Sequence, residues 1–258
     1  MTADGRNVAG EQAALVAALR NPACYPHPAG QVEVIETHVS YVLLSGAYAY
    51  KIKKAVALGF LDFGTLARRR FFCEEELRLN RRLAPELYLA VVAITGPPDA
   101  PQFAANGEAI EYAVQMIRFP QEALLDRQLA AGCLSPNVID QLADQLADFH
   151  ERAERAPPDR RSGSPEAVWE PIAQNFAQLG DQLSGAAHRA RLADLEAWSR
   201  RRFSQLADLL ATRLRDGWIR ECHGDLHLGN IVRTGAGLRI FDCIEFDPGL
   251  RWIDVLNE

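Results

Sequence analysis

The sequence lacks a long hydrophobic run, an excess of basic residues and a secretory signal. The formal net charge is −6, whereas a nucleic-acid-binding surface needs a concentrated basic face. No apolar run approaches the roughly 20 residues that span a bilayer, and the N-terminus has no basic start followed by an apolar stretch. We therefore expect a soluble, cytoplasmic protein that binds neither nucleic acid nor membrane. The negative charge is compatible with a cationic substrate.

The cysteines are few and unpaired in sequence. There are five, at positions 24, 73, 133, 222 and 243, and no two of them form a C-x-x-C pair. An odd number at wide spacing excludes a disulfide framework and a zinc finger, and it fits a reducing cytoplasm.

Glycine-rich phosphate loops are also missing. The sequence contains neither G-x-x-x-x-G-K-[ST] nor G-x-G-x-x-G. A single glycine, Gly46, lies between two expected strands, where the backbone amides of a tight turn could approach phosphate oxygens.

What the first half does contain predicts a small antiparallel sheet and one long helix. An amphipathic helix at about 10–19 and a proline-rich turn precede β-branched and aromatic runs, which predict strands at 32–35, 40–45, 47–53, 87–94 and 110–116. Thr65 is a favourable N-cap for a helix that runs to about Leu83.

The second half is mainly helical. Pro136 opens a helix whose apolar residues follow the helical period, and a polar linker at 157–165 precedes two more helices at about 167–180 and 186–215. Short strands are expected at 219–222, 230–233 and 238–241. A β-rich half followed by a helical half predicts an α+β, two-lobed protein.

A loop among these last strands has the residues that phosphoryl transfer requires. It reads Cys222-His223-Gly224-Asp225-Leu226-His227-Leu228-Gly229-Asn230, and Asp242 follows twelve residues after Asn230. Asp225 can accept the proton of an attacking hydroxyl, while Asn230 and Asp242 offer the hard oxygen ligands that Mg²⁺ takes. Singly these are ordinary turn or capping residues. The prediction depends on their joint spacing.

The spacing H-x-D-x-x-x-x-N followed by D is that of the protein-kinase catalytic loop, with Gly224 in place of arginine. The H-G-D form resembles the aminoglycoside phosphotransferase and choline kinase group of the kinase-like superfamily. Four more segments resemble the N-terminal domain of the bifunctional aminoglycoside phosphotransferase/ATP-binding protein family. They are YKIKK at 50–54, GFLDF at 59–63, FDCIEF at 241–246 and RWIDV at 251–255.

The resemblance implies a protein-kinase-like two-lobed fold. An N-terminal helix and turn at 1–30 would precede an N-lobe at 31–117, which holds the antiparallel sheet and one helix. A mainly helical C-lobe at 118–258 would hold the catalytic loop. The family continues past the point where this sequence ends, so we expect the C-terminal helices, which build much of the acceptor pocket, to be missing.

The resemblance also assigns nucleotide-binding residues. Lys51 would hold the phosphates, and Lys53 shares its face of the strand. A helix carboxylate positions the lysine in kinases. Glu76 matches the family's helix in register, with Glu75 as the alternative beside Glu74. The adenine would hydrogen-bond to the backbone of Gln115, Met116 and Ile117.

Other residues near the loop receive structural roles. By the resemblance, Asp254 ties the catalytic loop down. We expect His223 to brace the loop through hydrogen bonds. A zinc site must also be considered, because His223 and His227 are four residues apart and near Cys222 and Cys243. In a loop, however, that spacing does not guarantee a common face.

The sequence thus predicts a phosphotransferase that uses ATP and Mg²⁺ and acts on a hydroxyl of a small molecule. The alternative is a nucleotide-sensing regulatory domain with little or no transferase activity, which would partner a P-loop ATPase domain in cis or in trans. A third reading, a catalytically dead scaffold, requires that Mg-ATP does not bind.

Overall fold

The computed structural model describes residues 3–58, 61–104, 106–157 and 161–258. Packing divides the chain into two compact units. The sheet unit comprises residues 1–142 and 225–248, and the helical unit comprises residues 143–224 and 249–258. The segment that contains Asp225, Asn230 and Asp242 therefore packs with the sheet. The lobe boundary expected after Ile117 stays a prediction.

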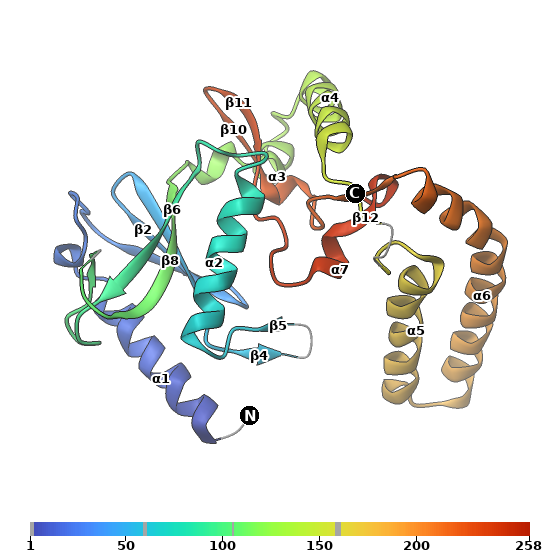
Figure 1. Cartoon of the computed structure of the whole chain (residues 1–258), viewed down its shortest axis with the longest axis horizontal. Coiled ribbons are helices and arrows are strands. Elements are labelled where there is room, and N and C mark those ends of the chain that lie inside the picture. The colour runs from blue at the N-terminus through green and yellow to red at the C-terminus, as the bar shows by residue number, and fades with distance from the viewer. Residues whose placement is uncertain (1–2, 59–60, 105, 158–160) are drawn as a thin grey trace. The chain divides into compact units, whose positions relative to one another are not determined.

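A six-stranded, fully antiparallel sheet forms the centre of the sheet unit, in the order β1-β2-β3-β8-β6-β7 (Figure 1). The strands are β1 (Glu33–Glu36), β2 (Ser40–Ser45), β3 (Tyr48–Lys53), β6 (Tyr88–Thr95), β7 (Gln102–Phe103) and β8 (Ala109–Ile117). The sequence predicts five of them. The sixth, β7, is a two-residue strand between the strands expected at 87–94 and 110–116, and it pairs with β6.

Two hydrophobic clusters cover the two faces of this sheet. Leu43 and Tyr50 pack in one cluster with Leu15 and Leu19, at the end of helix α1 (Ala3–Ala18) and just after it. Leu44 and Ala49, their neighbours in sequence, pack in the other cluster with Cys73 of α2 (Leu66–Asn80). Successive strand residues face opposite sides, so one helix packs on each face.

Helix α2 begins as the sequence predicts. The backbone N–H of Arg68 donates to Thr65 Oγ1 over 3.2 Å, which is the expected N-cap. The helix ends at Asn80 rather than near Leu83, because residues 81–83 form a turn.

Shorter elements complete the sheet unit. These are η1 (Pro22–Cys24), β4 (Ala57–Leu58), β5 (Leu61–Asp62), η2 (Gln121–Ala123), α3 (Leu125–Ala130), η3 (Leu228–Asn230), β10 (Ile231–Thr234) and β11 (Gly237–Ile240). Strands β10 and β11 form the hairpin predicted between Asn230 and Asp242. Gly59 and Phe60 of the resembled GFLDF segment lie outside the described residues.

The helical unit contains a long antiparallel helix pair, α5 (Pro165–Gln182) and α6 (Ala186–Arg215), which lie side by side (Figure 1). Helix α4 (Pro136–Arg152) leads into this unit and α7 (Pro248–Arg251) leads back. Its remaining elements are β9 (Ile219–Glu221), β12 (Trp252–Asp254) and η4 (Val255–Asn257). The sequence predicts α4, α5, α6 and β9 but not β12. Residues 158–160 of the expected linker lie outside the described residues.

Among the residues that the structure describes, no helix combines the length and the apolar character needed to cross a bilayer. The cytoplasmic location stays a prediction.

Candidate active site

A cavity of about 590 Å³ in the sheet unit is lined by six of the expected site residues, and it brings together Lys51, Asp225, Asn230 and Asp242 with Met116 and Ile117. Along β3, the wall of the cavity changes from apolar to charged. Ala49, opposite Leu44 and Met116, gives an apolar end, and Lys51 follows two residues later on the same face. The cavity therefore has an apolar part and a charged part.

Glu76 lies between the two lysines of β3. Its Oε1 is 2.9 Å from Lys51 Nζ, and its Oε2 is 2.7 Å from Lys53 Nζ. The side chain of Glu76 is 0% exposed, and that of Lys53 is 1% exposed. Glu74 and Glu75, in contrast, pair with Arg70 and Arg78 of their own helix. Of the three consecutive glutamates, Glu76 is thus the one that contacts the lysines.

Two more carboxylates complete this buried network. Asp242 contacts Lys51, and Glu245 contacts Lys53. Burial by itself lowers the pKa of each lysine, but Asp242 and Glu76 raise the pKa of Lys51 well above its usual value. Glu245 and Glu76 likewise raise the pKa of Lys53. Both lysines therefore stay cationic at neutral pH, and Lys51 presents its charge to the cavity.

The segment around Asp242 is held by hydrogen bonds from its backbone. Asp242 has φ +66°, in the left-handed region that side-chain-bearing residues rarely adopt. Its N–H donates to Tyr88 Oη over 3.2 Å, and the N–H of Cys243 donates to Asn80 Oδ1 over 2.9 Å. Asn80 follows Glu76 by one helical turn, so one face of α2 holds both the lysines and this segment. Strain that the surrounding structure maintains is typical of functional sites.

Asn230 is oriented by Asp225. Its Nδ2 donates to the Asp225 carbonyl oxygen over 3.0 Å and to Asp225 Oδ2 over 3.4 Å. This leaves the amide oxygen of Asn230 for a cation. The Asn230 amide oxygen and the Asp242 carboxylate line the same cavity, and both are hard oxygen ligands of the kind that Mg²⁺ prefers.

The Asp225 side chain is 54% exposed and lies beside His227. His227 Nδ1 accepts from the Gly229 N–H over 3.1 Å, and its Nε2 lies 3.7 Å from Asp225 Oδ2. His227 therefore stands beside the carboxylate rather than away from it.

Three of the expected nucleotide-binding residues, Lys53, Glu76 and Gln115, do not line this cavity. Lys53 is buried behind Lys51, over the ring of Phe63. Gln115 Nε2 donates to Tyr50 Oη over 3.1 Å and lines a second cavity of about 340 Å³. Met116 and Ile117 do line the main cavity. Because β8 has a neighbour on each side, its backbone pairs within the sheet, and the cavity wall continues along Arg118, Phe119 and Gln121.

Gly46 is not at the cavity. It has φ +57°, and a Cβ there would lie 2.5 Å from the carbonyl oxygen of Pro28. Instead, the cavity is lined by the turn between β1 and β2, residues Thr37, His38 and Val39. The prediction of a phosphate-binding turn at Gly46 was wrong. The sequence does not show which of the two consecutive turns, β1–β2 or β2–β3, lines the cavity that contains Lys51.

In the helical unit, Glu258 holds the start of the segment that leads to Asp225. Its carboxylate accepts the backbone N–H of His223 over 2.7 Å and that of Gly224 over 2.9 Å, and His150 Nε2 lies 3.5 Å away. Burial raises the pKa of Glu258, but these hydrogen bonds outweigh it, so the pKa is lowered. The His223 residue is 0% exposed.

The loop-holding role expected of Asp254 therefore belongs to Glu258. Asp254 pairs with Arg213 over 2.5 and 2.8 Å and caps η4 through the Leu256 N–H. The resemblance pointed to Asp254 instead of Glu258, and the two acidic residues lie in the same short C-terminal stretch.

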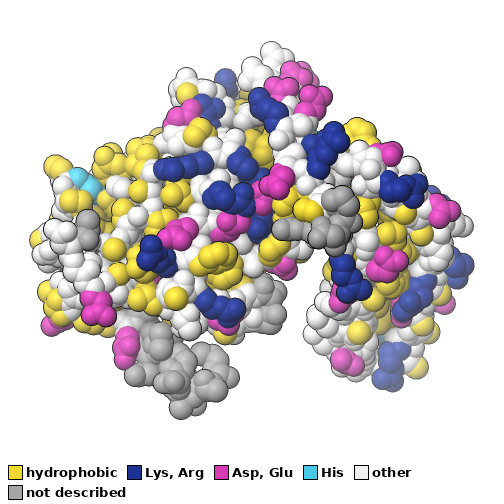
Figure 2. All heavy atoms as spheres, in the orientation of Figure 1, with side chains coloured by type: hydrophobic (Ala, Val, Ile, Leu, Met, Phe, Trp, Pro, Cys, Tyr) yellow, Lys and Arg dark blue, Asp and Glu magenta, His cyan; other side chains and the backbone are white. Residues whose placement is uncertain are grey.

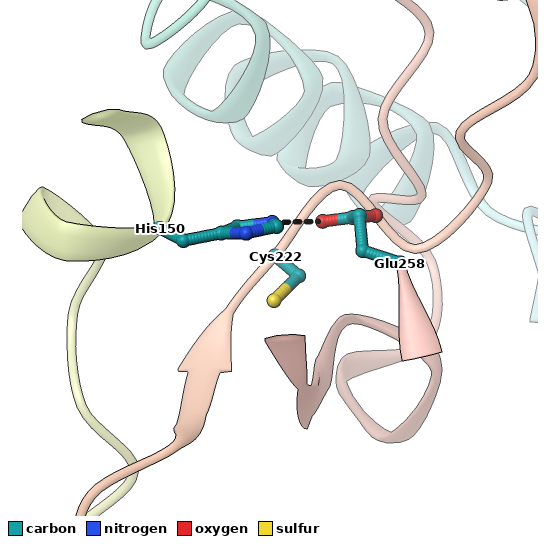
Figure 3. Close-up of side chains that lie close together, drawn as sticks. All are labelled: His150, Cys222 and Glu258. Carbon is teal, nitrogen blue, oxygen red and sulfur yellow. Dashed lines mark ion pairs between the residues drawn. The ribbon is translucent and has the colours of Figure 1, made fainter. Parts of the chain in front are cut away.

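His150, Cys222 and Glu258 place their ligand atoms within 4.8 Å of one another (Figure 3). Among the described residues this is the group that could hold a metal, and His223 with His227 forms no such group. Because both Glu258 oxygens already accept backbone N–H groups, we assign the trio to bracing the loop.

The backbone conformation and the surroundings of position 224 both require glycine. Its φ is +86°, and a Cβ would lie 2.7 Å from the carbonyl oxygen of Leu250. Only glycine meets both conditions.

Comparison with known proteins identifies the family of this chain. Residues 60–257 match the phosphotransferase enzyme family (APH). The uncharacterized proteins Rv2004c of Mycobacterium tuberculosis and Mb2027c of Mycobacterium bovis are each 30% identical over 238 residues, which is 91% of this chain and 46% of the relative. The glucosamine kinase of Mycolicibacterium smegmatis is 35% identical over 120 residues, 46% of this chain and 26% of that enzyme. The chain thus spans about half the length of the curated relatives that it matches most fully. On the family match, this chain belongs to the phosphotransferase enzyme family.

Proposed function

We propose that the chain is an ATP- and Mg²⁺-dependent phosphotransferase that acts on a hydroxyl of a small molecule. The observation that carries the proposal is the single cavity that joins Lys51, Asp225, Asn230 and Asp242. Membership of the phosphotransferase family supports it.

Each residue then has a role that its environment permits. Lys51, kept cationic by Asp242 and Glu76, binds phosphate oxygens. Asn230 and Asp242 hold Mg²⁺, which when bound neutralises charge on the phosphates. Asp225, exposed at the cavity, orients the acceptor hydroxyl and takes its proton. The apolar part around Ala49 and Met116 packs against the adenine, and Arg118, Phe119 and Gln121 line the same cavity.

For the acceptor we propose an amino sugar. The supporting observations are the similarity to a glucosamine kinase and the net charge of −6, which favours a cationic substrate. A phosphate-transfer assay on glucosamine, with glucose as the uncharged control, tests this class. Equal turnover of the two sugars would contradict it.

The function is tested by Asp225→Asn. Loss of the base should lower turnover by about 10²- to 10⁴-fold while Mg-ATP affinity stays within about twofold. Phosphate transfer and calorimetric titration with Mg-ATP measure the two quantities. Asp208→Asn, at an exposed position of α6, is the matched control. Turnover that survives in Asp225→Asn would remove Asp225 from the mechanism.

The second candidate is a regulatory module that binds nucleotide for a P-loop ATPase domain. The chain covers 46% of its mycobacterial relatives, which leaves room in those proteins for a second domain. Mg-ATP binding without transfer to any member of a broad acceptor panel would favour the module over the enzyme. Absence of Mg-ATP binding would exclude both.

A further inference from the structure

The turn between β1 and β2 has no role in the function proposed so far, although it lines the same cavity. Along β2, the residues Ser40, Val42 and Leu44 face the cavity. Val42 pairs with Lys51, and Ser40 pairs with Lys53. The strand therefore runs from the apolar part at Leu44 to the charged part at Ser40, and the turn begins where the charged part ends.

This turn is closed without glycine. The N–H of Thr37 donates to the Ser40 carbonyl oxygen over 2.9 Å, and Thr37 Oγ1 both accepts from the Ser40 N–H and donates to the same carbonyl. The carbonyl oxygen of Val39 accepts from the Lys54 N–H over 2.8 Å. Thr37 and Val39 are thus engaged in holding the turn and in fixing it to the end of β3.

Of the three turn residues Thr37, His38 and Val39, His38 is the one not yet assigned a role. It is exposed and lines the cavity, and the hydrogen bonds found among the described residues do not use its imidazole. A histidine in either protonation state carries at least one N–H donor. A donor at the charged part of a cavity that already holds Lys51 suits an anionic ligand group.

We propose that His38 donates a hydrogen bond to the terminal phosphates of the bound nucleotide. In this chain a side chain of the β1–β2 turn would supply the contact that glycine-rich loops supply through backbone amides. The proposal rests on the function proposed above. The role of His38 differs from those of Lys51 and the metal ligands, because His38 would contact the phosphates from the β1–β2 turn.

The test is calorimetric titration of wild type and His38→Ala with Mg-ATP and with adenosine. Loss of a hydrogen bond to a charged group should weaken Mg-ATP binding about 10- to 100-fold. Adenosine affinity should not change, because adenosine carries no phosphate. His38→Asn, which keeps an N–H donor, should restore part of the lost affinity. His188→Ala, an exposed histidine of α6, should leave both affinities unchanged.

The outcomes separate the two proposals. If wild type binds no Mg-ATP, both the proposed function and the role of His38 are wrong. If wild type binds and His38→Ala binds equally well, only the role of His38 is wrong. An equal loss for ATP and adenosine would show that the substitution alters the cavity rather than a phosphate contact, and it would also overturn the proposal. Equal thermal unfolding midpoints of the variants control for folding, since substitutions at exposed sites usually have small effects.

Discussion

The sheet unit and the long helix pair of the helical unit differ in how they bury charge. The sheet unit buries Lys53, Arg69, Glu76, Glu111 and Glu245 in ion pairs. In the helical unit every residue of α5 and α6 is described, and none of them is buried. The sheet unit fixes these charges in place at high cost, whereas helices α5 and α6 expose apolar side chains to their surroundings. Elsewhere the helical unit also buries an ion pair, between Glu221 and Arg251.

Helix α6 shows this exposure most clearly. Leu195, Trp198, Leu206 and Leu209 are each at least 38% exposed. At 100° per residue they lie within about 80° of one another. Figure 2 shows Lys and Arg side chains beside hydrophobic ones over this helix pair. The helical unit therefore depends less on its long helices for stability than the sheet unit depends on α2.

The largest expected effect comes from breaking the buried charge network. Glu76→Gln leaves Lys51 and Lys53 without their shared counter-charge, and disrupting a buried ion pair typically costs about 3–5 kcal/mol. Urea unfolding should show a lower midpoint with an unchanged slope. Glu74→Gln, whose exposed pair with Arg70 is worth at most about 1 kcal/mol, is the adjacent control. Similar losses for the two variants would remove the distinction between buried and exposed glutamates on α2.

A second effect separates Glu245 of the sheet unit from Asp254 and Glu258 of the helical unit by pH. Burial raises the pKa of Asp254, but Arg213 and the Leu256 N–H outweigh it, so the pKa of Asp254 is lowered like that of Glu258. Carboxylates with a lowered pKa stabilise the fold above their unfolded values of about 3.9 and 4.3, and this stabilisation is lost as the pH falls through the folded pKa.

In the sheet unit, burial raises the pKa of Glu245 against the opposing effect of Lys53, so Glu245 does not add to this acid-side loss. Unfolding free energies measured between pH 7 and pH 3 should fall at the acid end for wild type. Glu258→Gln should flatten that fall, and Glu245→Gln should not. A flatter curve in Glu245→Gln would reverse the assignment.

The smallest effect is expected on α6. Leu195→Lys and Leu209→Lys should each change the unfolding free energy by no more than about 0.5 kcal/mol, because both side chains are more than half exposed. Leu79→Ala, in the fully buried face of α2, should cost about 2–5 kcal/mol. A large loss from either α6 substitution would mean that this face is covered, contrary to the comparison of the two units.

The sequence was sufficient where local chemistry decides the structure. Thr65 caps α2, β2 has its expected bounds, and Lys51 and Lys53 share a strand face because strand residues alternate. It was insufficient where distant segments meet. Glu258 reaches the amides of His223 and Gly224 from the other end of the helical unit's sequence, and Asn80 reaches Cys243 across more than 160 residues. Hydrogen-bond partners so far apart in the sequence produce no periodicity or spacing from which they could be predicted.

Within the site, the same limit explains the β1–β2 turn. A glycine marks a left-handed backbone, but it does not show whether that turn faces a ligand or, as at Gly46, the carbonyl of Pro28. The Thr37–Ser40 turn carries no such mark, because side-chain hydrogen bonds close it.

The glycine of the H-G-D loop also limits how this loop could have changed in evolution. An arginine at position 224, as in H-R-D loops, would need both a different φ and removal of the Leu250 carbonyl, which lies 26 residues further along the chain. A single substitution cannot meet both requirements. The two kinds of catalytic loop are therefore separated by a coordinated change in two backbone segments, and a lineage with this glycine would have to alter α7 and the loop together to exchange one for the other.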